Sequence, residues 1–300
     1  MKKAVILGIA GAFFFAFTFV LNKSMHLSGG NWVWSASLRY LFTLPILAAI
    51  VGKRYGFRNV HSAIVSMPKQ WLLWSTAGFG LFYAPLTFAG DHGEAWLVAA
   101  SWQITITSGI LLSPLFNTKI SMRNLAASAV ILTGVFILQT RVTHELDTAS
   151  ALYTLVPILI ASFAYPLGNR KMMSVCSGRI STTERVYGMT LCSVPFWLGL
   201  SVYGLFAKGA PSANQSIQAF LVALFSGVIA TLLFFKATDM VKTNIRWLAA
   251  VESTQAFEVI FSLLGGVLLL GEAVPDAAGT AGIFLIVGGI VLNSLLSLRH

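Results

Sequence analysis

The segment from Trp247 to Glu272 reads WLAAVESTQAFEVIFSLLGGVLLLGE, and it decides the class of this chain. The segment is long and apolar enough to cross a bilayer, which takes about 20 residues of helix. Its first half nevertheless holds Glu252, Gln255 and Glu258. A charged side chain such as Asp at the centre of a membrane helix costs about 2.5–3.5 kcal/mol on insertion scales. A segment that keeps two acids therefore predicts a polar cavity inside the membrane, of the kind that solutes pass through.

The composition of the whole chain points to the same class. Of its 300 residues, 56% are hydrophobic and only 10% are charged, whereas an average soluble domain has about 25% charged residues. We therefore expect an all-α integral membrane protein with ten transmembrane helices, nearly all of it in the bilayer. The apolar blocks of membrane-spanning length are residues 4–22, 32–52, 71–90, 95–115, 124–140, 151–168, 185–206, 217–236, 247–271 and 278–298.

The distribution of basic residues predicts the orientation of these helices. A net charge of +10 would suggest nucleic acid as the partner of a soluble chain, but in a membrane protein Lys and Arg gather in cytoplasmic loops. If the N-terminus is cytoplasmic, only Lys23, Arg141 and Lys208 of the 20 basic residues fall outside, and Arg39 lies within a helix. We therefore expect a multi-pass protein of the cell membrane with both termini inside. Its partners would be the lipid bilayer and a small-molecule substrate, and not nucleic acid.

The chain divides into two similar halves on either side of the loop 141–150. The first segment ends in Leu-Asn22-Lys-Ser-Met, and the sixth ends in Gly-Asn169-Arg-Lys-Met. Because each half has five helices, an odd number, the second half must enter the membrane from the opposite side. We expect two inverted five-helix repeats, residues 1–141 and 150–300, an architecture that supports alternating access around a site near the midplane.

Three stretches carry a family resemblance that covers the whole chain. Residues 257–272, FEVIFSLLGGVLLLGE, resemble the LEPVFAALLGVLLLGE segment of the drug/metabolite transporter superfamily, ten-helix EamA-like branch. Residues 14–23 are similar to the first helix of that branch, and Ser37-Leu-Arg-Tyr40 is similar to its LRF element. The multidrug resistance efflux subgroup is the most similar part of the branch.

The resemblance implies a secondary active exporter of small organic solutes or drugs that works by alternating access, with proton coupling as one option. Two departures limit what is carried over. Val259 stands where the family has a proline, so we expect a straighter ninth helix. The first and sixth segments have no acidic residue, so the membrane glutamate of the four-helix small multidrug transporters has no equivalent here.

Glu252 takes that role in our interpretation. At about 100° per residue, Glu252 and Gln255 share one helix face, and Glu258 turns toward a neighbouring helix. We favour Glu252 as the group that titrates with substrate or proton binding, and Glu258 as a structural acid. Arg39 is too deep in the second segment to reach the interface, and its planar fork suits a buried carboxylate. That carboxylate is either Glu258, which we favour, or a group on the substrate.

Other candidates lie on the fourth and sixth segments. Trp102 and Gln103 form either an aromatic wall for an organic cation or ordinary packing. Tyr165, with the proline that follows it, is expected to interrupt the sixth segment and to allow a gate. Asn22 and Asn169 hold equivalent positions in the two halves, which suits paired gates. Glu272 lies in a short outer loop, where we expect it to be solvated.

Three functions remain open at this point. The leading one is export of a hydrophobic or cationic compound. A second is export of an amino acid or other metabolite whose carboxylate meets Arg39. The third, from another class, is a non-transporting sensor or scaffold. We do not expect an enzyme, a metal or a cofactor, because the five histidines lie in loops or at the terminus and no P-loop occurs. Both a monomer and a homodimer are compatible with the sequence.

Overall fold

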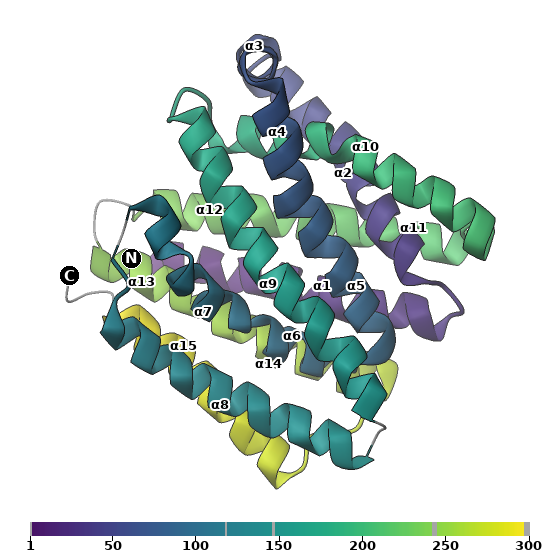
Figure 1. Cartoon of the computed structure of the whole chain (residues 1–300), viewed down its shortest axis with the longest axis vertical. Helices are drawn as coiled ribbons and strands as arrows, with labels where there is room; N and C mark the ends of the chain where they lie inside the picture. The colour runs from purple at the N-terminus through teal and green to yellow at the C-terminus, as the bar shows by residue number, and fades with distance from the viewer. Residues whose placement is uncertain (1, 118, 146–147, 242–244, 297–300) are drawn as a thin grey trace.

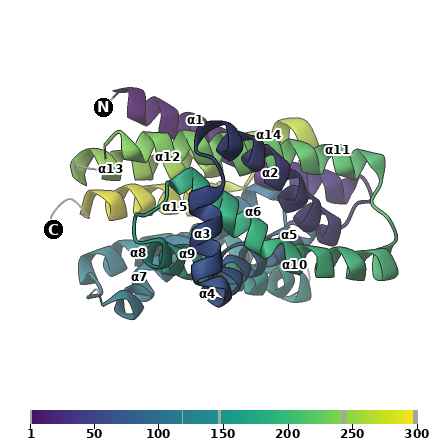
Figure 2. The same ribbon diagram turned by 90° about the horizontal axis from the view of Figure 1, so that it is seen from above.

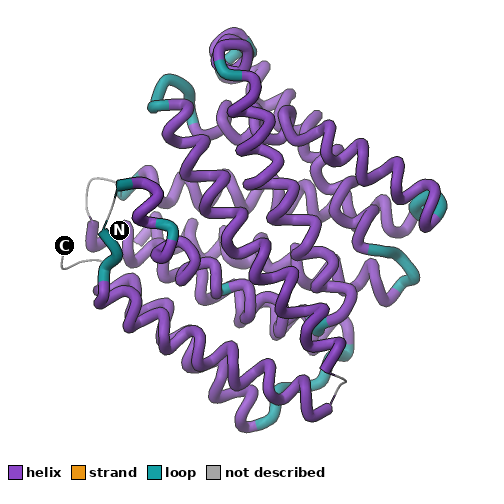
Figure 3. The backbone as a smooth tube through the Cα atoms, viewed as in Figure 1, coloured by secondary structure: helices purple, strands orange, loops and turns teal. Residues whose placement is uncertain are grey.

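Helices account for all regular structure in the described part of the chain, residues 2–117, 119–145, 148–241 and 245–296 of a computed structural model (Figure 3). Within these residues, nine stretches are long and apolar enough to cross a membrane, and Ala95–Leu111 is a shorter apolar stretch at the fourth position. The predicted helical membrane class is therefore confirmed. Six of the spans are single helices: α1 (Lys2–Leu27), α2 (Trp32–Arg54), α8 (Met122–Glu145), α9 (Thr148–Cys176), α10 (Thr182–Lys208) and α15 (Ala277–Leu296).

The third and eighth spans each contain a π-helical stretch. In the third, η1 (Thr76–Gly80) joins α4 (Pro68–Ser75) to α5 (Leu81–His92). The eighth consists of α11 (Ala213–Val222), η3 (Ala223–Ala230) and α12 (Thr231–Asp239). A π turn is rare and widens the helix locally, and such turns are frequent at functional sites.

The fourth and ninth spans are interrupted near their middles. Gln103 separates α6 (Ala95–Trp102) from α7 (Ile104–Leu111), and the 3₁₀ turn η2 (Ser113–Phe116) follows. In the ninth span the 3₁₀ turn η4 (Ser253–Gln255) separates α13 (Ile245–Glu252) from α14 (Ala256–Leu270). The ninth helix is thus not straightened by the missing proline, because its break precedes that position by several residues.

Three expectations about the helices need correction. The sixth span is not interrupted at Tyr165 and Pro166, since α9 continues through both of its prolines; membrane helices tolerate proline where neighbouring groups satisfy the freed carbonyl. The loop expected at 141–150 is shorter, because α8 ends at Glu145 and α9 begins at Thr148; residues 146–147 lie outside the described residues. The sequence also hid α3 (Arg58–Ser66), a short helix anchored by a hydrogen bond from the Trp71 indole to the Ala63 carbonyl (2.9 Å).

The packing of the helices follows a regular pattern. Helix α1 packs against α12 and α14, and α9 packs against α5 and α7. Helix α2 packs against α10, while α8 and α15 lie side by side along one edge of the molecule (Figures 1 and 2). The start of α1 and the end of α15 lie at the same end of the bundle (Figure 1).

Glycines allow the closest of these contacts. A Cβ atom at Gly168 would lie 2.3 Å from the Cα of Gly78, so η1 and α9 cross with backbone against backbone. A Cβ at Gly134 would lie 2.6 Å from the Gly282 carbonyl oxygen, where α8 crosses α15. Small residues of this kind let membrane helices approach each other closely. Gly282 therefore supports a close helix contact within the chain.

We expect Gly168→Ala to lower the stability of the fold by about 1–3 kcal/mol, the usual cost of overpacking. The added methyl group meets the Gly78 backbone, which cannot move aside as a flexible side chain can. Thermal unfolding of the purified protein in detergent, followed by tryptophan fluorescence, measures the effect. Gly199→Ala is the matched control, because a Cβ there has no atom within 4 Å. Equal melting temperatures for the two variants would contradict the prediction.

Candidate functional site

A cavity of about 180 Å³ lies inside the bundle, walled by residues from both halves of the chain. We call it the central cavity. Its wall includes residues of α1, α2, α5, α9, α10 and α12, together with residues at both helix interruptions. Seven residues that the sequence singled out lie in this wall: Arg39, Trp102, Gln103, Tyr165, Asn169, Gln255 and Glu258.

The two interrupted helices meet at Glu258. The side-chain amide of Gln103, at the break between α6 and α7, hydrogen-bonds Glu258, and α6 packs against α14. Glu258 is buried and lies in the first turn of α14. The positive end of a helix dipole stabilises an acidic group there. Glu258 is therefore held by a dipole and by an amide, with its carboxyl in the cavity wall.

Arg39 is buried in the same cavity wall and makes no salt bridge to an acid among the described residues. Its Nη2 donates a hydrogen bond to Ser226 Oγ (3.0 Å), and its guanidinium lies 3.9 Å from the centre of the Tyr83 ring. Among the described residues, Arg39 has no carboxylate oxygen within 4.0 Å. The ion pair with Glu258 that the sequence favoured is thus not formed. The π-electrons of the Tyr83 ring and the hydroxyl of Ser226 stabilise part of the Arg39 charge instead.

The partners of Arg39 connect it to α1. Ser226 shares a hydrogen bond of 2.6 Å with Thr18, and Tyr83 accepts one of 3.1 Å from the amide of Asn22. We call the Asn22–Tyr83 bond the outer contact. Asn22 itself is buried and does not line the cavity. Arg39 on α2 thus lies where α1, α5 and η3 come together.

One wall of the cavity is aromatic. The rings of Phe82 and Tyr165 are 4.7 Å apart, and Trp102 lies 5.0 Å from Phe82 and 5.6 Å from Tyr165. These three rings come from α5, α6 and α9. Trp102 therefore packs within an aromatic cluster and also lines the cavity. The sequence offered packing and an aromatic wall as alternatives, and the position of Trp102 is compatible with both.

Glu252 lies outside the cavity, with an exposed side chain at the end of α13. The sequence grouped Glu252 with Gln255 on one face, whereas in the structure Gln255 and Glu258 share the wall. On an α-helix Gln255 lies about 60° from Glu252 and about 60° from Glu258, so it can share a face with either acid. Burial of Glu258 against α6, which the sequence does not show, decides that Gln255 is grouped with Glu258.

The sequence did not identify several residues in and around the cavity. Tyr40 stacks on Trp197 with ring centres 4.5 Å apart, and Phe82, Tyr83 and Ser226 complete the surroundings of Arg39 and Trp102. Tyr40 follows Arg39 directly, and Ser226 precedes a glycine in a long apolar segment. Neither position indicates a cavity residue in the sequence, because the cavity forms only when helices distant along the chain pack together.

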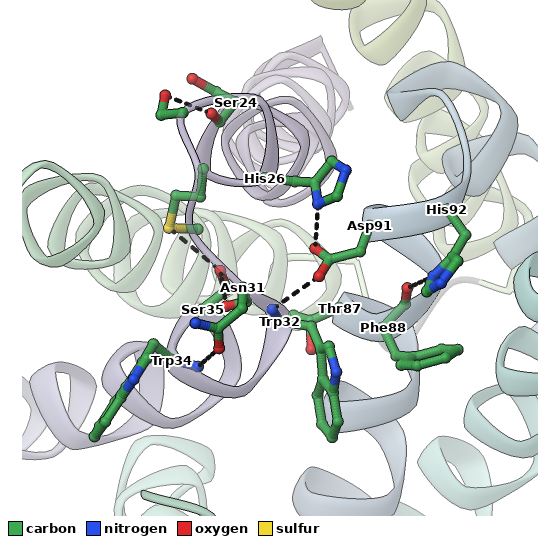
Figure 4. A network of polar contacts seen from close by, with 12 residues as sticks. Ser24, His26, Asn31, Trp32, Trp34, Ser35, Thr87, Phe88, Asp91 and His92 are labelled. Carbon is green, nitrogen blue, oxygen red and sulfur yellow. Dashed lines mark hydrogen bonds and ion pairs between the residues drawn. The ribbon is translucent and has the colours of Figure 1, made fainter. Parts of the chain in front are cut away.

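A polar network ties the ends of three helices together at the far end of the bundle from the chain termini (Figure 4). Asp91, near the end of α5, accepts a hydrogen bond from the backbone N–H of Trp32 (3.0 Å) and lies 3.5 Å from His26 of α1. The acid therefore caps the start of α2 and binds the end of α1.

Glu272 has a similar role at the start of α6. Its Oε1 accepts a hydrogen bond of 2.6 Å from the backbone N–H of Ala95, the first residue of that helix. The side chain is half-buried. The expectation of a solvated loop acid was therefore wrong, because an unsatisfied helix N-terminus draws a carboxylate to it.

A family model matches residues 2–299, nearly the whole chain, and its description is "Putative multidrug resistance efflux transporter" (EmrE). The chain belongs to this family. Membership makes this multi-pass efflux transporter a protein of the lipid bilayer with a small-molecule substrate, and it implies a transporter rather than an enzyme.

Two bacterial proteins are similar to this efflux transporter in sequence. One is "Uncharacterized protein YjlA" of Bacillus subtilis (strain 168), 47% identical over 98% of this chain and 95% of its own length. The other, from Shouchella clausii, is 45% identical over 86% of this chain and 70% of its own length, and is called "Uncharacterized 42.1 kDa protein in intracellular alkaline protease 3'region". A protein of known crystal structure superposes over 100% of this chain and 99% of its own with a TM-score of 0.66. Its 12% identity shows a shared fold alone.

We expect Glu272→Ala to lower the stability of the transporter by about 1 kcal/mol, the usual cost of losing a helix N-cap. The start of α6 would lose its acceptor at Ala95. Thermal unfolding in detergent measures the loss. Glu252→Ala removes an exposed acid from the same span and should leave the melting temperature unchanged; an equal loss in both variants would refute the capping role.

Proposed function

We propose that this protein is a secondary active exporter that carries a small organic solute through the central cavity by alternating access. One observation supports it above all others. A cavity walled by residues from both halves of the chain places one acid, Glu258, and one base, Arg39, beside an aromatic wall in the interior of a member of an efflux family. Such a wall suits a solute with an apolar or aromatic body and polar groups at its ends.

We further propose that residues 1–141 and 150–300 are inverted repeats. The pairing of helices supports this division, because the first span packs on the eighth and ninth spans as the sixth packs on the third and fourth. The interruptions support it too: π-helical stretches lie in the third and eighth spans, and breaks lie in the fourth and ninth. A two-fold relation between the halves would pair each of these features with its counterpart.

With both termini in the cytoplasm, as the basic residues predict, the cavity faces inward. Asn169, Val186 and Phe235 line it, and each lies toward the end of its helix that then points to the cytoplasm. On the outer side the contact between Asn22 and Tyr83 closes the path. Asn22 and Asn169 thus occupy a closed and an open gate in the same molecule, as an alternating-access cycle requires of paired positions.

Glu258 is the group that we propose to exchange a proton during transport. It is buried in the cavity wall with the uncharged Gln103 as its hydrogen-bond partner, and the charge of Arg39 acts on it through space without a salt bridge among the described residues. A carboxyl without a fixed counter-ion at membrane depth is neutralised by a proton or by a basic group of the solute, and this competition couples the two. Glu252, exposed outside the cavity, has no such position.

We expect Glu258→Gln to abolish the dependence of transport on an imposed pH gradient. An amide at this position cannot exchange a proton, so the rate measured with the gradient should fall to the rate measured without it. The measurement is flux of ethidium, 2-phenylethylamine, 3-phenylpropionate and L-phenylalanine in proteoliposomes, with and without the gradient.

Glu252→Gln is the matched control, the same change in the same span but outside the cavity, and should retain gradient-driven flux. Loss of coupling in Glu252→Gln with normal coupling in Glu258→Gln would assign proton exchange to Glu252 instead of Glu258. Absence of flux for all four compounds with the wild-type protein would contradict the exporter and favour a sensor or scaffold.

A further inference from the structure

Arg39 has one guanidinium nitrogen for which the fold provides no partner. Its Nη2 binds Ser226 and its flat face lies on Tyr83, but Nη1 is buried and makes no hydrogen bond to any residue that the structure describes. The side chain as a whole is 7% exposed, and it lines the central cavity. Leaving a buried charged donor unpaired is costly. A fold that retains it has a position prepared for an acceptor that arrives from outside the chain.

We propose that Nη1 of Arg39 binds an anionic group, a carboxylate, on the transported solute. The inference rests on the proposed export function and names the chemical class of its substrate. An arginine bound through one nitrogen and stacked through its face keeps its remaining donors in a fixed plane, which suits carboxylate recognition. The aromatic cluster of Phe82, Trp102 and Tyr165 lines the same cavity and would hold the apolar body of the solute.

The alternative acceptor is Glu258 in another conformation of the protein. In the structure Glu258 already has Gln103 as its partner and lies in the first turn of α14, which stabilises it without Arg39. Arg39 in turn is fixed by contacts to η3 and α5. An internal pair would need Glu258 to leave Gln103, whereas a solute carboxylate needs only that the buried Nη1 become accessible from the cavity.

The position of Arg39 also links recognition to the closed side of the cavity. Tyr83, under the guanidinium, makes the outer contact with Asn22, and Ser226 is bound to Thr18. A carboxylate on Nη1 would weaken the attraction between the guanidinium and the Tyr83 ring, since it neutralises the charge that the ring attracts. Solute binding would thereby loosen the contacts that hold α1 to α5 and η3.

The test is equilibrium binding to the purified full-length protein of three radiolabelled compounds with the same aromatic body: 3-phenylpropionate, L-phenylalanine and 2-phenylethylamine. We expect the two carboxylates to bind and the amine to bind at least about tenfold more weakly, as expected when a charged hydrogen bond is lost. Arg39→Lys, which keeps the charge and loses the fork, should weaken carboxylate binding by a similar factor.

Arg170→Lys is the matched control, because Arg170 donates to the Gly109 carbonyl (2.6 Å) and does not line the central cavity; it should bind all three compounds as the wild type does. Protection of the wild-type protein against thermal unfolding by the same compounds repeats the test without a variant, in case Arg39→Lys does not fold.

Binding of the amine as tight as that of the carboxylates, no binding of either carboxylate, or unchanged carboxylate binding in Arg39→Lys would overturn the proposal. Flux of the amine or of ethidium without carboxylate binding would leave the exporter standing and remove this inference. Carboxylate binding at Arg39 without flux of any compound would support this inference and contradict the exporter.

Discussion

A helix that is interrupted inside a bilayer leaves backbone amide and carbonyl groups that lipid cannot satisfy, and the rest of this structure depends on where those interruptions lie. Irregular backbone at membrane depth is tolerated where protein or a polar cavity surrounds it. Gln103 and Gln255, at the breaks of the fourth and ninth spans, both line the central cavity. The π-helical η3 contributes Ser226 to the same wall. The cavity and the irregular helices thus require each other.

The electrostatics of the cavity follow from the same arrangement. The break at Gln255 starts a new helix, α14, whose positive end lies beside Glu258. The acid is therefore stabilised locally and does not depend on Arg39. Arg39, stabilised by Tyr83 and Ser226, does not depend on Glu258. Two ionisable groups that are supported independently can each exchange a partner, whereas a tight internal ion pair would compete with every solute.

The sequence predicted the helical membrane class, the positions of the spans and the seven polar or aromatic residues of the cavity wall named above, because hydrophobic blocks and isolated polar residues are local signals. It did not predict the interruptions. Nothing in Ser253-Thr-Gln255 resembles a helix breaker such as proline or glycine, although a 3₁₀ turn lies there. Conversely, Pro166 suggested a break that α9 does not have. The partners of Arg39 were beyond the sequence as well, since Ser226 lies 187 positions away along the chain.

The segment at residues 257–272 gains a physical meaning from these contacts. Its two acids bind the ninth span to the fourth at two heights: Glu258 through Gln103 inside the membrane, and Glu272 through the N–H of Ala95 at the end of the helices. Helix α6 runs between those two partners, so α14 and α6 are clamped at both ends of α6. Any motion that opens the cavity between these helices has to release one contact before the other. Glu258 lines the central cavity and Glu272 does not, so in the proposed export cycle a solute in the cavity would act first on the contact with Gln103, while the contact of Glu272 with Ala95 keeps the two helices in register.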